Sequence, residues 1–449
     1  MIPEPLNLGA TPLAVLTAWP TDLPLACVWA GGDDQAPRPP ERRWTLLGIA
    51  GEILDSRSSA SGDASPAFMR APRAAANLQA PPLPAHIGWI AYDVGRVLEP
   101  KAASPNGART DRPVPRLLFR RVEEGLAYDH ATGRWWGAGG RARRLAREID
   151  GSPAIDPGGF RLGGVASGTG QGAFGAAVAR AIEYIRAGDA YEVNLAHRLS
   201  GPFIGNARAV FTGLCTVARP WHGVHVEGPG IAVASASPEL FLHFDPATRV
   251  LRTRPMKGTR PAGAAGAHDD LERSPKDRAE LAMIVDLMRN DLGRVCDLGS
   301  VRVETSRCIE RHDAGVLQAT ATVSGTLRAG LTLADVLAAM FPAGSVTGAP
   351  KIRAMQIIDE LEPVRRGVYC GSAGYVADDG RAMLNVAIRT AVITGRDGAR
   401  PGEFDDATFD YSVGAGIVAD SDPQAEWQET LDKASVLARL AEIATPPRG

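Results

Sequence analysis

The chain has 449 residues, 45% of them hydrophobic, with a formal net charge of -2 and a pI near 6.5. This composition is ordinary for a globular protein with a substantial core, and the small net charge excludes the broad basic field that nucleic acids or anionic membranes attract. A small ligand is the better expectation. Residues 1–10 lack the basic segment and apolar core of a signal peptide, and no stretch approaches about 18 uncharged apolar residues, so we expect a cytoplasmic protein.

The five cysteines are widely spaced and form no Cys-x-x-Cys pair. Their number and spacing fit a reducing compartment without a disulfide framework or a zinc site. We expect all of them to be buried: Cys27, Cys215, Cys296, Cys308 and Cys370.

The chain divides into three parts by composition. Residues 1–150 alternate short apolar runs with breaks rich in Pro, Ala and Ser, which predicts an N-terminal region of strands and loops. Residues 151–172 are rich in Gly, Ser and Pro, and we interpret them as a linker or surface loop; no predicted strand precedes their glycines, so a nucleotide-binding loop is not favoured. Residues 173–445 form a second domain of helices and strands joined by hairpins, which predicts an α+β fold with antiparallel sheets.

An acid and an amine are predicted to lie close together in this second domain. Residues 230–236, 239–244 and 250–256 are predicted strands, and a turn at residues 245–248 makes the last two a hairpin. Glu239 and Lys257 are about equally far from that turn, so they should lie near the same end. Neighbouring Arg254 and Arg260 would favour the neutral, nucleophilic form of Lys257. The alternative is a solvated lysine at a strand end.

A predicted helix over residues 275–295 carries carboxylates on its apolar face. Ser274 is the expected N-cap. Glu280 and Asp291 fall on the apolar stripe, where a carboxylate must be paired or bound to a cation, so Glu280 is a candidate metal ligand. The alternative is a salt bridge to Arg289 or Arg294.

A second pair of carboxylates lies on a predicted C-terminal helix that starts at Asp422. Glu426, Glu429 and Lys433 recur on one face of it, and the two glutamates with Glu280 could hold one Mg²⁺ through oxygen ligands. A solvated helix with ion pairs inside it is the alternative. The same face carries two further residues, Leu437 and Leu440.

The segment Gly344-Ser-Val-Thr-Gly-Ala-Pro-Lys351 precedes a predicted helix that runs to about residue 361. Free backbone N–H groups at a helix start form an anion site. The segment is not a phosphate-binding Walker loop, because two residues separate Gly348 from Lys351 and Ile352 replaces the hydroxyl residue. A carboxylate is therefore the expected anion, and a purely structural turn is the alternative.

Together these segments resemble the chorismate-utilising enzymes, which include anthranilate synthase large subunits, aminodeoxychorismate synthases, isochorismate synthases and salicylate synthases. The similarity spans roughly residues 173–441, and its ordered blocks make coincidence negligible. The blocks are Gly188-Asp-Ala-Tyr-Glu-Val-Asn-Leu195, Ser237-Pro-Glu239, Arg254-Pro-Met-Lys-Gly-Thr-Arg260, Ala279-Glu280, Val285-Asp-Leu-Met-Arg-Asn-Asp291, Ala343 to Lys351, Tyr369-Cys-Gly-Ser-Ala-Gly-Tyr375, Ile388-Arg389, and Gly414-Ala-Gly-Ile-Val418 with Glu426 and Glu429.

The resemblance implies an anthranilate synthase component I-like sandwich of large antiparallel sheets in two subdomains with flanking helices. Within the family, Lys257 looks like the aminodeoxychorismate synthase form, since anthranilate synthases usually carry alanine there; Gly88-Trp-Ile-Ala-Tyr-Asp-Val-Gly-Arg96 is also similar to that branch. The implied reaction converts chorismate and ammonia to 4-amino-4-deoxychorismate for p-aminobenzoate and folate synthesis. Anthranilate synthase component I is one alternative, and a non-catalytic scaffold that activates a glutamine amidotransferase is another.

The resemblance also implies roles for residues. Lys257 would attack C2 of chorismate while Glu239 protonates the departing C4 hydroxyl, and ammonia would then add at C4 and expel the lysine. Mg²⁺ would be held by Glu280, Glu429 and Glu426 and would orient the ring carboxylate. The other substrate-binding positions are Arg389 and Tyr369 for the enolpyruvyl carboxylate, and Thr259, Ser345, Gly348, Ala349, Gly414, Gly416 and Lys433 around the ring.

Two residues depart from the common family pattern. Glu192 stands where many relatives have glutamine and where isochorismate and salicylate synthases place a water-activating lysine, so direct addition of water is disfavoured. Gln318 stands where anthranilate synthases have a histidine, and glutamine cannot act as an acid. The chain also lacks a cysteine nucleophile with a downstream His–Glu pair, so ammonia is expected from a separate glutamine amidotransferase.

Overall fold

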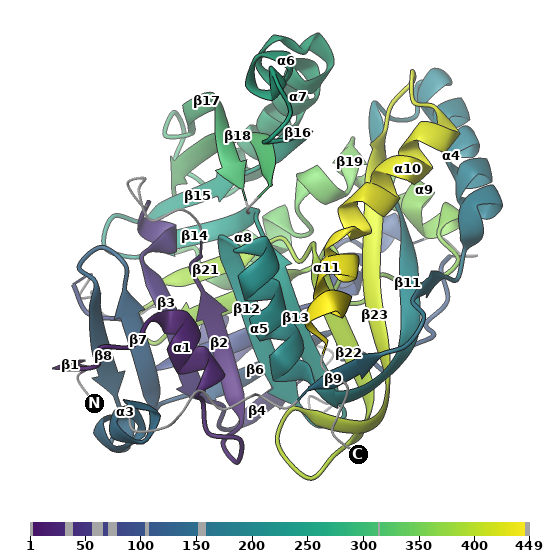
Figure 1. Cartoon of the computed structure of the whole chain (residues 1–449). Coiled ribbons are helices and arrows are strands. Elements are labelled where there is room, and N and C mark those ends of the chain that lie inside the picture. Colours follow the sequence, from purple (N-terminus) through teal and green to yellow (C-terminus); the bar gives the residue numbers. More distant parts are fainter. Residues whose placement is uncertain are drawn as a thin grey trace.

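Two large antiparallel sheets form the framework (Figure 1). The computed structural model describes residues 3–31, 39–55, 66–70, 79–103, 107–150, 159–312 and 315–444. Within these residues, every pair of neighbouring strands in the two sheets is antiparallel, as the hairpin-rich sequence predicts.

The first sheet has 13 strands and contains both the first and the last strand of the described chain. Its order is β1 (Glu4–Leu6), β8 (Arg134–Ala138), β7 (Gly125–Asp129), β3 (Trp44–Ile49), β2 (Leu25–Trp29), β12 (His222–Gly228), β13 (Ile231–Ser237), β22 (Thr390–Asp397), β23 (Glu403–Ile417), β11 (Glu192–Asn206) and β10 (Ala166–Ser167), with β9 (Phe160–Leu162) and β19 (Gly348–Ala349) also paired to β11.

The second sheet has 10 strands. Its order is β16 (Met256–Pro261), β18 (Val316–Thr326), β15 (Val250–Arg254), β14 (Leu240–Asp245), β21 (Ala382–Asn385), β20 (Ser372–Ala377), β5 (Ala85–Ile90), β6 (Leu117–Val122) and β4 (Ile53–Asp55), with β17 (Arg302–His312) paired to β18.

One hydrophobic core lies between the sheets, and others lie under the helices. Val28 and Val224 from the first sheet pack in one cluster with Trp89 and Leu118 from the second. Each fully buried side chain of this size contributes roughly 1.5–3 kcal/mol to folding. The sheets are therefore held face to face by apolar burial.

Helices cover the outer faces of the sheets. The first sheet packs with α1 (Pro12–Thr17), α3 (Ala142–Asp150), α5 (Ala207–Ala218) and α11 (Val436–Ile443). The second packs with α7 (Pro275–Gly293), α8 (Leu333–Met340) and α6 (Ala267–Arg273). Around β11 and β23 lie α4 (Gly170–Arg186), α9 (Lys351–Leu361) and α10 (Pro423–Ala434), while the short α2 (Gly95–Leu98) follows β5. None of the described helices is long and apolar enough to cross a lipid bilayer.

The predicted fold class is confirmed, and local signals predict several element ends. Ser274 caps α7 by accepting a hydrogen bond from the N–H of Asp277 at 3.2 Å. Asp422 caps α10 through the N–H groups of Gln424 and Ala425. The helix predicted to end near residue 361 is α9.

Two details of the sequence prediction are wrong. The C-terminal helix breaks at Ser435, so Leu437 and Leu440 belong to α11 and are buried against α5, whereas the side chain of Glu429 is half exposed. Cys308 is exposed, although the other four cysteines are buried as expected.

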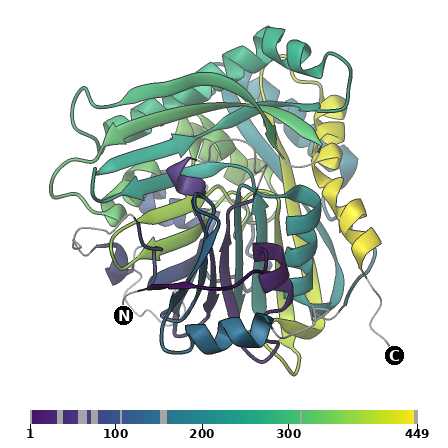
Figure 2. The same cartoon turned by 60° about the vertical axis from the view of Figure 1, so that its left-hand side comes forward.

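The N-terminal region contributes strands to both sheets. Strand β2 pairs with β12, and β5 pairs with β20, so strands from the first 150 residues extend each sheet (Figure 2). The predicted linker contains β9 and β10, and α4 begins at Gly170; residues 151–158 of it lie outside the described residues. The division into domains at residues 1–150 and 173–445 stays a proposal.

Candidate active site

A buried ion pair joins the two sheets at one end of the molecule. Lys257 lies on β16, the edge strand of the second sheet, and Glu192 is the first residue of β11 in the first sheet; Figure 1 labels both strands. The Nζ of Lys257 donates a hydrogen bond to Oε1 of Glu192. The side chains of Lys257 and Glu192 are 13% and 1% exposed. The predicted nucleophile is therefore not a solvated strand-end lysine.

Glu239 lies close to this pair, as the hairpin geometry predicts. It precedes β14, whose Leu240 pairs with Arg254 of β15, and Lys257 follows on β16. Ser345 Oγ donates a hydrogen bond of 2.5 Å to Glu239 Oε1. Burial raises the pKa of Glu239 to about 7, against the opposing effects of Ser345 and Lys257. A substantial fraction of Glu239 is thus protonated near neutral pH, as a general acid requires.

The predicted effect of neighbouring arginines on Lys257 is wrong. Arg254 pairs with Glu310, and Arg260 pairs with Asp270 and Asp277, so their charges are already compensated. Burial lowers the pKa of Lys257, but the carboxylates of Glu192, Glu280 and Glu239 outweigh it and hold that pKa above its ordinary value. Lys257 therefore rests as an ammonium ion.

The candidate metal ligands approach one another from two helices. Glu280 on α7 and Glu426 on α10 both have raised pKa values, chiefly because of burial. Burial also acts on Glu429, but Lys433 lowers the pKa of Glu429 below its usual range, through a contact of 2.7 Å. The charge of Lys276, which is 3.8 Å from Glu280, acts on all of these glutamates.

These glutamates offer suitable donors without forming a closed site. In the described ranges, no group of three or more His, Cys, Asp or Glu side chains is gathered closely enough to hold an ion. The ion pair predicted as the alternative within the C-terminal helix is present, since Glu429 contacts Lys433. Glu280 contacts Lys276, whereas the predicted alternative partners are Arg289 and Arg294. Buried Glu426 and half-buried Glu280, both with raised pKa values, nevertheless form an environment that favours a cation, and carboxylate oxygens suit Mg²⁺.

The segment before α9 is fastened to the start of β11. Gly348 and Ala349 form β19 and pair with Val193 and Glu192. A Cβ on Gly348, which has φ +130, would lie 2.1 Å from the carbonyl oxygen of Glu192, so only glycine fits. Lys351 does not reach the ion pair, because its Nζ donates to Asp291 at 2.6 Å.

Two glycines of β23 lie beside the Lys257–Glu192 pair and Tyr369. A Cβ on Gly416 would lie 2.4 Å from Glu192 Oε1 and 2.9 Å from Lys257 Nζ. A Cβ on Gly414 would lie 3.0 Å from the hydroxyl of Tyr369, and the carbonyl of Gly414 accepts a hydrogen bond of 2.8 Å from Lys433. The structure thus brings Gly414, Tyr369 and Lys433 together.

Two predicted substrate-binding residues lie on, or next to, strands of the two sheets. Thr259, on β16 beyond Lys257, is exposed and accepts a hydrogen bond of 3.2 Å from Gln318. Arg389 precedes β22 with φ +50, is half-buried, and its carbonyl accepts the N–H of Ala236 at 2.9 Å. Their roles in binding stay predictions.

Sequence reasoning missed residues that support the site. Arg366 is buried, pairs with Glu362 and donates to the carbonyls of Val346 and Asn194, at 2.8 and 2.6 Å. It thereby fixes the Ser345 segment against β11. The sequence signal that could have indicated this pair is the spacing of four residues between Glu362 and Arg366. Lys276, which contacts Glu280, was also missed and has the same spacing from its partner.

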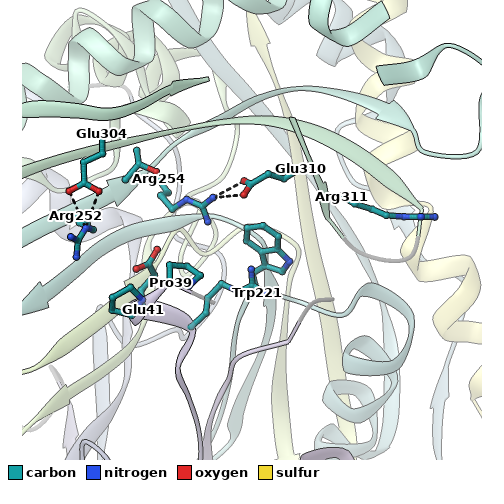
Figure 3. Close-up of a pocket in the computed structure, with 11 residues that line it drawn as sticks. Pro39, Glu41, Trp221, Arg252, Arg254, Glu304, Glu310 and Arg311 are labelled. Atoms are coloured by element: carbon teal, nitrogen blue, oxygen red, sulfur yellow. Dashed lines mark hydrogen bonds and ion pairs between the residues drawn. The ribbon is translucent and has the colours of Figure 1, made fainter. Parts of the chain in front are cut away.

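A cavity of about 440 Å³ lies beside β15, the strand that leads to Lys257, but none of the predicted site residues lines it (Figure 3). Arg252 pairs there with Glu304, and Arg254 pairs with Glu310. These guanidinium groups are neutralised by acids of the same wall, just as Lys257 is neutralised by Glu192. The cavity therefore differs from the candidate site in the residues that line it and not in the pairing of its cations.

Comparisons with known proteins agree with this geometry. A family model described as chorismate binding enzyme matches residues 34–439. Anthranilate synthase component 1 1 of Haloarcula marismortui is 37% identical over 387 residues, 80% of this chain and 76% of that protein. Aminodeoxychorismate synthase component 1 of Klebsiella aerogenes is 43% identical over 264 residues, 58% of this chain and 55% of that protein.

The fold is also found in a solved structure. Anthranilate synthase component I from Streptococcus pneumoniae has a TM-score of 0.71 at 24% identity, and the match covers 97% of this chain and 92% of that one. This likeness agrees with the two-sheet framework, and the range that the family model matches includes Lys257. The chain therefore belongs to the chorismate binding enzyme family.

Proposed function

We propose that this chain is the synthase subunit of an aminodeoxychorismate synthase, which converts chorismate and ammonia to 4-amino-4-deoxychorismate. The observation that carries the proposal is Lys257, a buried amine held near the carboxyl group of Glu239. Relatives named anthranilate synthase and aminodeoxychorismate synthase both match this chain, so their names alone do not distinguish the two reactions.

The reaction begins with two groups of opposite function. Neutral Lys257 attacks C2 of chorismate, and Glu239 gives its proton to the hydroxyl that leaves C4 as water. Ammonia then adds at C4 while the bond between C2 and the lysine breaks. The buried position of Glu239 supports its role, because a raised pKa keeps the carboxylic acid available near neutral pH.

Other side chains would hold the substrate. Tyr369, Lys433 and the backbone of Gly414 form one wall, and Ser345 fixes Glu239. Glu280, Glu426 and Glu429 would hold Mg²⁺, which when bound supplies positive charge to the ring carboxylate. We further propose that ammonia comes from a separate glutamine amidotransferase, consistent with relatives that are named as component 1.

Chromatography of the reaction products tests the proposal. The purified chain with chorismate, Mg²⁺ and ammonium should form 4-amino-4-deoxychorismate, which becomes p-aminobenzoate when a lyase is added. Lys257→Ala should lower this activity by about 100-fold or more, because the nucleophile is lost. Lys101→Ala, at an exposed lysine, is the matched control and should leave the product and the rate unchanged.

Two results would contradict the proposal. Formation of anthranilate by the wild-type chain would identify an anthranilate synthase component I, and unchanged amination by a folded Lys257→Ala variant would refute the lysine adduct. Absence of any product with ammonium, in the presence of tight binding to an amidotransferase, would support the scaffold alternative. Efficient use of glutamine by the chain alone would refute the separate partner.

A further inference from the structure

Glu192 contacts Lys257 through only one of its two carboxylate oxygens. Its Oε1 accepts a hydrogen bond from Lys257, but its buried Oε2 finds no hydrogen-bond partner among the described residues. An ionised carboxylate with an unsatisfied buried oxygen is costly. The neutral acid would be cheaper to bury once the lysine has lost its charge.

The backbone around the pair leaves room for close contact. Gly416 of β23 pairs with Asn194 of β11, and a side chain at Gly416 would collide with both Glu192 Oε1 and Lys257 Nζ. Arg366 anchors the carbonyl of Asn194, so the start of β11 is fixed opposite β16. The pair is thus positioned by both sheets.

Few other acceptors can take a proton from Lys257. Its side chain is 13% exposed, which limits direct exchange with water. Glu239 and Glu280 act on its charge, as does Glu429 from α10, but Glu192 alone of these described carboxylates contacts Nζ. Glu239 must moreover keep its own proton for the leaving hydroxyl.

From this geometry we infer that Glu192 is the proton acceptor that converts Lys257 from an ammonium ion to a nucleophilic amine. The inference rests on the proposed function. The proton moves from Nζ to Oε1, the freed lone pair forms the bond to C2, and the proton on Glu239 leaves with the C4 hydroxyl as water. When ammonia expels the lysine, Glu192 returns its proton to Nζ, and Glu239 regains one from solvent.

Because the proton moves from Lys257 to Glu192 and not to solvent, this transfer should not depend on the pH of the solution. In the wild type, kcat at saturating chorismate should be level on the acid side and fall as pH rises through about 7, where Glu239 ionises. In Glu192→Gln, Lys257 must lose its proton to solvent, so kcat should fall by about 100-fold near pH 7 and rise with pH on the acid side. Ammonium is adjusted to give the same concentration of neutral ammonia at each pH.

A second measurement does not depend on turnover. Reductive methylation with formaldehyde and cyanoborohydride, followed by peptide mass spectrometry, reports the neutral amine of each lysine. Removal of the Glu192 charge should make Lys257 react several-fold faster at a given pH, since its pKa falls by at least about 1 unit. Asp291→Asn removes the partner of another buried lysine, Lys351, and should leave the methylation of Lys257 unchanged.

The outcomes separate the two claims. Equal methylation of Lys257 in wild type and Glu192→Gln, or the same pH profile of kcat in both, would overturn the role of Glu192. The wild type by itself also provides a test, even if the variant fails to fold. Fast methylation of Lys257 at neutral pH would show that its amine is already neutral, and would overturn the role of Glu192. If the wild type forms anthranilate but the methylation of Lys257 changes as expected, the proposed function is refuted. The claim that Glu192 exchanges a proton with Lys257 then still stands.

Discussion

At the scale of single residues, the protonation of Glu239 links activity to stability. Glu239 is 4% exposed, and burial raises the pKa of its carboxyl group to about 7 from 4.5. A carboxyl group whose pKa is raised by folding binds more protons in the folded than in the unfolded state. Its contribution to stability is therefore complete below the unfolded pKa and decreases as pH rises through the folded pKa.

The variant Glu239→Gln should remove this pH dependence. The free energy of unfolding of the variant minus that of the wild type should be higher at about pH 8 than at about pH 5, by on the order of 2 kcal/mol. Urea unfolding followed by circular dichroism at both pH values measures the difference. Activity should be lost because glutamine cannot donate this proton. A stability difference that does not change with pH would show that Glu239 is ionised throughout.

The sequence predicts which residues meet at the site better than it predicts their charge states. The hairpin spacing brings Glu239 and Lys257 together, as observed. The protonation of Lys257 could not be predicted in the same way, because its partner Glu192 lies 65 residues earlier and the adjacent arginines turn to other acids. Side-chain direction is set by tertiary packing and not by distance along the chain.

At the scale of elements, His197 fastens α10 to β11. Thr430 donates its hydroxyl hydrogen to the carbonyl of Trp427 at 2.7 Å, so it accepts from His197 Nε2 at 2.8 Å. Ser167 meets the other ring nitrogen at 3.0 Å, and Trp427 stacks on the ring at 4.5 Å. Burial lowers the pKa of His197 to about 4, which keeps it neutral. His197 thus helps to position the helix that carries Glu426 and Glu429.

Replacing His197 with alanine should loosen α10. We expect a loss of about 2 kcal/mol in stability from the cavity and the lost hydrogen bonds. We also expect a several-fold higher Mg²⁺ concentration for half-maximal activity, since Glu426 and Glu429 would be less well positioned. Thermal unfolding and Mg²⁺ titration measure the two effects, with His268→Ala, at an exposed histidine, as the control. An unchanged Mg²⁺ requirement would separate α10 from metal binding.

Helix starts were predictable, whereas one helix break was not. Ser274 and Asp422 are side-chain caps whose effect is local and readable from the sequence. The break at Ser435 has no glycine or proline to announce it. It follows from packing, because α11 turns its leucines into the core beneath α5 while α10 follows β23.

At the scale of the whole molecule, the two sheets are completed by strands distant in sequence. The antiparallel α+β class could be predicted from hairpins, but not the pairing of β2 with β12 or of β5 with β20. Such pairings depend on burial across the sandwich, which no local pattern specifies. A division of the sequence near residue 150 therefore need not separate independently folding units.

Expression of residues 159–449 alone should give an insoluble or non-cooperative product. Removal of the earlier residues would leave the edges of β12 and β20 unpaired and expose the apolar core that Trp89 and Val28 fill. Co-expression with residues 1–158 should restore a soluble complex. Solubility, near-ultraviolet circular dichroism and urea unfolding measure this, and a cooperative transition of the isolated fragment would contradict it.

The carboxylates that surround Lys257 constrain the sequence of ligand addition. Glu192, Glu280 and Glu429 all act on this single ammonium ion, even when Glu239 is protonated, so the resting enzyme presents excess anionic character to an incoming dianion. Under the proposed function, electrostatic repulsion would favour an ordered encounter in which a divalent counter-ion binds before chorismate. The acids that prepare the amine would thereby also act as a gate that admits substrate only to a charge-compensated enzyme.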